Sequence, residues 1–129
     1  MERLQKGEQL MCEIFGEETV ESYNHNLSAI SPSFLNFLKG TFGDIYAETE
    51  LDLKTKEIIV LSSLITQKDT KPQIKVHIKA AIKAGITPKE ILALILHLVI
   101  YVGFPSTLNA LNTAKEVFDE LGIDIITEQ

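Results

Sequence analysis

The sequence has little cysteine, no excess of positive charge and no long apolar segment, and each shortage excludes a class of protein. Cys12 is the only cysteine, which excludes an intramolecular disulfide, a CxxC redox pair and a zinc site made of several cysteines. The 12 basic residues against 18 acidic ones give a net charge of -6, which disfavours a nucleic-acid or anionic-lipid partner. The most apolar stretch, Ile91–Val102, is shorter than the roughly 20 residues of a transmembrane helix. We therefore expect no nucleic-acid partner and no membrane span.

The remaining composition is typical of one soluble globular domain. The chain has 129 residues, of which 45% are hydrophobic, with 7 Gly and 4 Pro. Such a chain buries a continuous core and is too apolar to be disordered, so we expect a single domain over residues 1–129. The first residues are charged and lack the apolar centre of a secretory signal. We expect a cytoplasmic protein.

In the first half of the chain, capping residues precede apolar residues at helical spacing. Ser31-Pro32 supplies an N-cap and a first-turn proline. The apolar stripe that follows consists of Phe34, Phe37, Leu38, Phe42 and Ile45. Asp52 caps a further helix that ends before the polar segment 66–72. The first thirty residues carry two shorter helical patterns.

The second half of the chain is helical by the same criteria. Residues 73–84 have lysines on one face and apolar side chains on the other. The segment Thr87–Glu90 is a capping box that leads into Ile91–Val102. Gly103 permits a break, after which a helix restarts with Leu108 on its inner stripe. No segment alternates as a strand does, so we predict an all-α fold of six or seven helices.

The segment Ile91–Val102 is apolar on every side of its helix. Such a helix is expected to be buried on nearly all sides. A chain this short buries it more easily when another subunit covers part of it. We therefore predict a homo-oligomer.

Glu57 is the first candidate for chemistry, because helical spacing places it among apolar positions. The stripe around it consists of Leu53, Val60, Leu61 and Leu64. A carboxylate there needs a partner, and a buried, partnered carboxylate is a plausible acid or base. The alternative is a structural glutamate that pairs with Lys54, with Lys56 or with the backbone near the helix N-terminus. Position alone favours the two interpretations equally.

Two histidines are further candidates. His77 lies on the apolar face of its helix, opposite the lysines, and His97 precedes Tyr101 by one turn inside the most apolar helix. An i,i+4 pair of this kind can share a proton or hold a ligand. From the residues alone, core packing is the more common role for both histidines. The three histidines of the chain show no HxxxH or HExxH spacing, so we predict no metal site.

Taken together, four segments resemble the carboxymuconolactone decarboxylase family. They are Leu51–Glu57, His77–Gly85, Thr87–Ile91 and His97–Pro105. The chain shows the ordered series H-x3-A-x3-G-x4-E-I followed by H-x3-Y-x-G-x-P. The match runs from about Tyr46 to Leu121, well over half of the chain.

The family also contains alkylhydroperoxidase-like proteins. In these proteins a CxxC motif is followed by three residues and then by the histidine. Here those positions are Thr70 and Gln73, so a thiol peroxidase is disfavoured. The resemblance to the decarboxylase branch implies a cofactor-free helical homo-oligomer, a trimer or a hexamer. It implies conversion of 4-carboxymuconolactone, or of a related small lactone or acid, by oxyanion stabilisation and proton delivery.

The resemblance assigns roles to particular side chains. The expected catalytic residues are Glu57, His77 and His97, with His77 as proton donor and Glu57 orienting it. The expected residues that bind the anionic substrate are Tyr101, Lys54 and Lys56. The alternative is a relative without decarboxylase activity that binds a small ligand or has a structural role as an oligomer.

Overall fold

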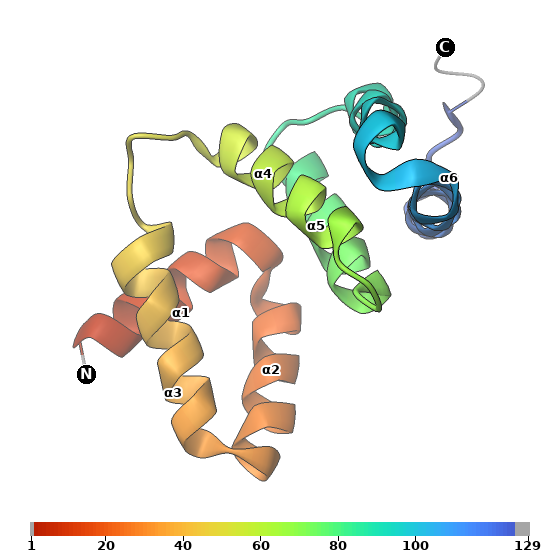
Figure 1. Cartoon of the computed structure of the whole chain (residues 1–129). Coiled ribbons are helices and arrows are strands. Elements are labelled where there is room, and N and C mark those ends of the chain that lie inside the picture. The colour runs from red at the N-terminus through yellow and green to blue at the C-terminus, as the bar shows by residue number, and fades with distance from the viewer. Residues whose placement is uncertain (1, 126–129) are drawn as a thin grey trace. The chain divides into compact units, whose positions relative to one another are not determined.

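The computed structural model describes residues 2–125, and its chain divides into two compact units, Met1–Leu51 and Asp52–Gln129. Every regular element among the described residues is a helix: six α-helices and one short π-helix (Figure 1). The all-α prediction is therefore confirmed. The prediction of one domain over 1–129 stays a prediction.

The first unit contains four helical elements. They are α1 (Glu2–Phe15), α2 (Glu17–Ile30), α3 (Pro32–Thr41) and the π-helix η1 (Phe42–Tyr46). The Ser31 side chain accepts a hydrogen bond from the Phe34 amide at 3.2 Å, as the predicted N-cap of α3. Helix α1 packs so closely on α3 and η1 that a Cβ at Gly7 would collide with the Lys39 carbonyl. The two helices predicted before residue 30 are α1 and α2.

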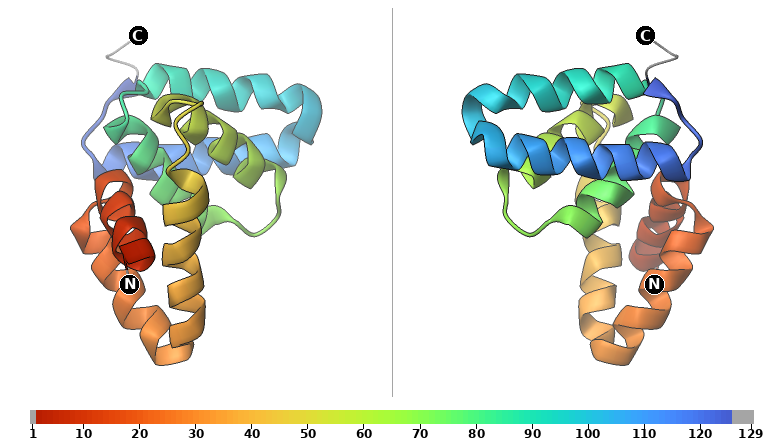
Figure 2. Two further views of the ribbon diagram at one scale, coloured as in Figure 1. Left: turned by 90° about the vertical axis from the view of Figure 1, so that its left-hand side faces the viewer. Right: turned by 90° about the vertical axis from the view of Figure 1, so that its right-hand side faces the viewer.

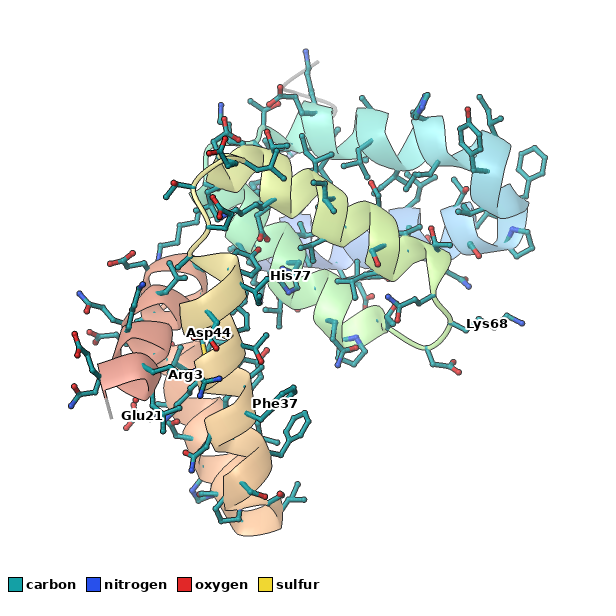
Figure 3. The ribbon with its side chains drawn as sticks, turned by 60° about the vertical axis from the view of Figure 1, so that its left-hand side comes forward. Arg3, Glu21, Phe37, Asp44, Lys68 and His77 are labelled. Atoms are coloured by element: carbon teal, nitrogen blue, oxygen red, sulfur yellow. The ribbon has the colours of Figure 1, made fainter. Side chains whose placement is uncertain are left out.

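The apolar stripe predicted over α3 and η1 is buried only in part. Phe34, Phe37 and Ile45 are exposed, and Leu35 is the buried apolar side chain of α3. Figure 3 shows Phe37 projecting from the helix. Close packing at glycine positions, together with Leu35, makes the inner face of this element, so apolar periodicity alone located that face incorrectly.

The second unit contains α4 (Leu53–Thr66), α5 (Lys71–Lys83) and α6 (Pro88–Glu120). The predicted caps are present, since Asp52 accepts from the Thr55 amide at 2.8 Å and Thr87 and Glu90 form a capping box. Gly103 adopts a positive φ of 85° in a non-helical conformation inside α6. The sequence predicted this break, and Figure 2 shows the two halves of α6 folded back beside each other on either side of it.

The core of the second unit lies between α4, α5 and both halves of α6. Its fully buried side chains include Leu61, Ile78, Ile91 and Ile95. By length and composition α6 is the one described helix that could cross a membrane, and only 17% of its most apolar stretch is buried. Within one chain Ile91–Val102 is therefore largely uncovered, and its burial with the help of another subunit stays a prediction. Leu108, predicted on an inner stripe, is also exposed.

Candidate active site

Glu57 occupies the second turn of α4, on the buried side of that helix. Its exposed fraction is 0%, and Leu61 and Ile65 continue the same buried stripe toward the end of the helix. The Asp52 cap fixes the residue at which α4 begins. The start of the helix sets the direction of each following side chain, including that of Glu57. Hydrogen bonds from Thr55 hold the pKa of Asp52 below its ordinary value, so this cap is a carboxylate at neutral pH.

The partner of Glu57 is His77 of α5, which is labelled in Figure 3. The His77 Nδ1 atom lies 2.9 Å from the Glu57 Oε1 atom, although the two residues are 20 positions apart. The side chain of His77 is 15% exposed, against 0% for Glu57. The two residues, called here the Glu57–His77 pair, therefore consist of a buried carboxyl group and a histidine that reaches toward solvent.

Helix α5 is placed beside α4 by a side-chain contact in the connecting loop. The Thr70 hydroxyl donates a hydrogen bond of 2.6 Å to the Leu64 carbonyl near the end of α4. Ile74, Ile78 and Ala81 of α5 are then buried against the core. His77 lies on the same side of the helix, and the turn therefore brings its ring to Glu57.

The contact suggests roles for the two nitrogens of His77. A carboxylate only accepts hydrogen bonds, so with Glu57 ionised the hydrogen is assigned to His77 Nδ1, which donates to Glu57 Oε1. A substrate that reaches the histidine then exchanges a proton with Nε2, on the other edge of the ring. A carboxylate behind the ring orients the imidazole and stabilises its protonated form. This arrangement is suited to proton transfer at Nε2.

His97 and Tyr101 lie on α6. Their rings contact each other, with centroids 6.0 Å apart at an angle of 54°. His97 is exposed, and Tyr101 is 75% exposed. The structure thus shows one contact between Glu57 and His77 and another between His97 and Tyr101.

His97 lines a groove between α4 and the first half of α6, called here the α4–α6 groove. The groove has a volume of ≈ 390 Å³. Its lining includes Lys54, Ile58 and Ser62 of α4 and Leu94, His97 and Leu98 of α6. Two of the predicted site residues, Lys54 and His97, thus share one groove, with an apolar floor between them.

The other lysines of this unit have different surroundings. Lys56 is half-buried on α4. Lys75 and Lys79 of α5 each form an ion pair of 2.9 Å with Glu120. These two ammonium groups lower the pKa of Glu120 to about 2. The lysine face of α5 is therefore largely neutralised by acids of α6.

A second pocket, which the sequence did not indicate, lies at the α4–α5 loop. It has a volume of ≈ 580 Å³, and its lining includes Lys68, Lys71, Asp69, Ile74 and Asn109. Figure 3 shows Lys68 projecting from this loop. Lys71 is paired with Glu116 at 2.8 Å. Ile74, one turn before His77, also lies in this lining, and no sequence pattern shared by the lining residues indicated the pocket.

Metal ligands are not gathered anywhere in residues 2–125. No group of three or more His, Cys, Asp or Glu side chains is placed to hold a metal ion in this part of the chain.

Known proteins similar in sequence to this chain include two named decarboxylases. A sequence profile of the carboxymuconolactone decarboxylase family matches residues 32–116. The chain is 28% identical over 123 residues to a 4-carboxymuconolactone decarboxylase of Acinetobacter baylyi, covering 95% of this chain and 91% of that protein. It is 25% identical over 117 residues to the nitrosuccinic acid decarboxylase of Metarhizium robertsii, covering 90% of this chain and 81% of that protein. These similarities support a decarboxylase-like role.

Proposed function

Because the chain belongs to the carboxymuconolactone decarboxylase family, we propose that it is a cofactor-free carboxy-lyase of the cytoplasm that removes CO2 from a small anionic lactone or acid. Its foremost candidate substrate is 4-carboxymuconolactone. The single observation that carries the proposal is the Glu57–His77 pair, with a fully buried carboxyl group 2.9 Å from His77 Nδ1.

The pair supplies the proton that the reaction needs. When the bond between the ring carbon and the carboxylate breaks, CO2 leaves and the electron pair is delocalised onto the lactone carbonyl oxygen. A proton must then reach the carbon next to that carbonyl, which reforms a neutral lactone. His77 Nε2 donates this proton, and Glu57 holds the imidazole in position through Nδ1. Solvent then returns a proton to Nε2.

The remaining roles are stabilisation of the oxyanion and binding of the substrate carboxylate. The His97 ring can offer an N–H donor and Tyr101 an O–H donor, which are groups of the kind that stabilise a developing oxyanion. Lys54, beside His97 in the α4–α6 groove, and Lys56 on the same helix supply positive charge for carboxylates. Lysine holds a carboxylate as a point charge, without the two parallel hydrogen bonds of arginine. This chemistry favours a substrate with one well-held carboxylate.

The acid that is decarboxylated can differ from 4-carboxymuconolactone. One similar protein bears the name of a nitrosuccinic acid decarboxylase. The feature common to the two named reactions is loss of CO2 from a small acid, which needs a proton donor and a stabilised anion in both cases.

A second candidate function is a small-ligand-binding or structural oligomer without lyase activity. The observation that favours it is the exposed apolar face of α6, which fits an assembly interface whether or not the protein is an enzyme. In both functions we propose a homo-oligomer, a trimer or a hexamer.

An ultraviolet assay tests the proposed function. 4-Carboxymuconolactone generated in situ, and nitrosuccinic acid in parallel, are incubated with wild type, His77→Ala and Glu57→Gln. We expect turnover of at least one acid by wild type and its loss in His77→Ala, with circular dichroism and oligomer size unchanged. Turnover that survives His77→Ala contradicts the assigned proton donor. If wild type turns over neither acid, the second candidate function is favoured.

A further inference from the structure

The pocket at the α4–α5 loop, called here the loop pocket, lies outside the residues that the proposed reaction uses. Its lining comes from the end of α4, from residues 67–71 and from the second half of α6. The lining includes neither member of the Glu57–His77 pair, and it shares no residue with the α4–α6 groove. In Figure 3, Lys68 lies at this loop and His77 farther along α5. The volume of ≈ 580 Å³ lies within the range of about 300–1,000 Å³ that small-molecule sites have.

The floor of the loop pocket is apolar and belongs to the core. Ile65, Ile74 and Ala110 line it, with exposed fractions of 4%, 7% and 1%. These side chains come from α4, α5 and α6, and all three are part of the buried cluster of the second unit. The packing of three helices therefore sets the shape of the pocket, and this shape does not depend on one exposed loop.

The wall that α6 contributes offers uncharged hydrogen-bonding groups. Ser106, Asn109 and Asn112 line the pocket on successive turns of the helix. The Thr113 hydroxyl, which also lines it, donates to the Asn109 carbonyl at 2.8 Å within the helix. The groups that this wall presents to a ligand are therefore the Ser106 hydroxyl and two side-chain amides. Each amide has two N–H donors and one carbonyl acceptor.

The wall that the loop contributes carries an excess of positive charge. Lys68, Asp69 and Lys71 line the pocket, so two ammonium groups lie beside one carboxylate. Lys71 also pairs with Glu116, which lies outside the lining, at 2.8 Å. Lys68 is therefore the cation that a ligand can engage without displacing that ion pair. In a chain with a net charge of -6, a cavity lined in this way favours an anion over a cation.

The two walls together define the chemistry of the ligand. One anionic group matches the single excess positive charge of the lining. Hydroxyl groups both donate and accept, so they match the amides of α6 and the Asp69 carboxylate. An aliphatic acid would leave these polar groups without partners when it covers them, which costs affinity. A phosphate ester carries a charge of about -1.5 to -2, which exceeds the excess charge of the lining.

We propose that the loop pocket binds a small sugar acid, a monocarboxylate with several hydroxyl groups. The carboxylate lies at Lys68, and the hydroxyl groups lie along Asn109 and Asn112. The bound acid joins the α4–α5 loop to the second half of α6. This site is separate from the Glu57–His77 pair and does not depend on the proposed lyase activity.

The experiment measures binding of gluconate by isothermal titration calorimetry and by NMR of the asparagine side-chain amides. Sorbitol has the hydroxyl groups without the carboxylate, hexanoate has the carboxylate without the hydroxyl groups, and glucose 6-phosphate replaces the carboxylate by a phosphate. The pocket variants are Lys68→Gln and Asn109→Leu. Their matched controls are Lys83→Gln and Asn26→Leu, which make the same changes at exposed residues outside the pocket.

We expect gluconate to bind with a Kd of about 1 mM and the other three compounds at least about tenfold more weakly. Each pocket variant weakens gluconate binding at least about threefold, while both controls stay within about twofold of wild type. A Kd for gluconate above about 20 mM overturns the proposal. Equal or tighter binding of any of the other compounds, or gluconate binding that neither pocket variant weakens, also overturns it. No lyase substrate is present, so the result is separate from the outcome of the decarboxylase assay.

Discussion

Replacement of Glu57 by Gln separates the proposed role of this residue in positioning His77 from a purely structural role. The Gln side chain has nearly the same shape, and its carbonyl oxygen still accepts a hydrogen bond from His77 Nδ1. A hydrogen bond to a charged group contributes about 1.5–3 kcal/mol and a neutral one about 0.5–1.5 kcal/mol. The substitution also removes the cost of burying a charge at a fully buried position. These opposing effects predict that the free energy of unfolding changes by less than about 1.5 kcal/mol.

The effect on activity is expected to be much larger. A neutral amide orients the His77 ring but does not stabilise its protonated form, which is the form that donates the proton from Nε2. Removal of a partner that orients and polarises a functional histidine costs about 10–100-fold in activity, and loss of general acid catalysis costs about 10²–10⁴-fold. We therefore expect kcat to fall about 100-fold in Glu57→Gln.

The assay measures initial rates by ultraviolet absorbance and unfolding by urea with circular dichroism. Glu13→Gln is the matched control, because Glu13 is an exposed glutamate of α1 and loses the same charge. We expect its rate to equal that of wild type. A folded Glu57→Gln variant with a rate within about threefold of wild type would refute the proton-transfer role. Destabilisation by more than about 3 kcal/mol would instead identify Glu57 as a structural residue.

Three further predictions concern the elements that position the site. Asp52→Ala removes the N-cap of α4 and is expected to lower the free energy of unfolding by about 1 kcal/mol in urea, whereas Asp52→Asn retains most of it. Gly103→Ala places a Cβ at φ 85° and is expected to cost about 1–3 kcal/mol, measured in the same way. Glu120 has a folded-state pKa of about 2, below its ordinary value of 4.5, because Lys75 and Lys79 bind it. Its contribution to stability is therefore present above about pH 4.5 and lost as the pH falls toward 2, and an NMR titration of its carboxyl carbon is expected to have a midpoint near 2, shifted upward in Lys75→Ala.

The sequence predicted the helix boundaries well because the signals for them are local. The Asp52 cap and the capping box at Thr87 involve atoms within three residues of each other, so the sequence contains both partners. The break at Gly103 follows in the same way from the only residue type that adopts its backbone conformation easily. Such features do not depend on how helices pack.

The sequence could not predict which apolar faces are covered. Periodicity shows that Phe34 and Phe37 share a helix face, and that residues 91–102 are apolar all round. It does not show whether the same chain, another chain or solvent lies against those faces, because burial depends on contacts distant in sequence. His97 was accordingly expected inside a buried helix and is exposed in one chain.

The Glu57–His77 pair could be predicted in part, unlike the helix boundaries, which were predicted well, and the covered apolar faces, which were not. Spacing correctly placed Glu57 on a buried stripe and His77 on an apolar face, while the contact between them depends on the hairpin that α4 and α5 form. The resemblance to a family supplied the link between the two residues that spacing could not. The larger pocket near Lys68 was missed because its lining comes from a polar loop and from α6, which carry no common sequence pattern.

The loop before His77 explains why proton transfer, and not thiol chemistry, fits this site. The position where the resembling peroxidases carry their first cysteine is Thr70, and its hydroxyl is committed to the Leu64 carbonyl at 2.6 Å. A hydroxyl group cannot reduce a peroxide as a cysteine thiolate does. The Thr70 hydroxyl instead closes the turn between α4 and α5. The same turn places His77 beside Glu57. Thr70, which stands at the position of the first cysteine, therefore helps to position the proposed proton donor His77. In the proposed reaction the acceptor of that proton is the carbanion left by loss of CO2.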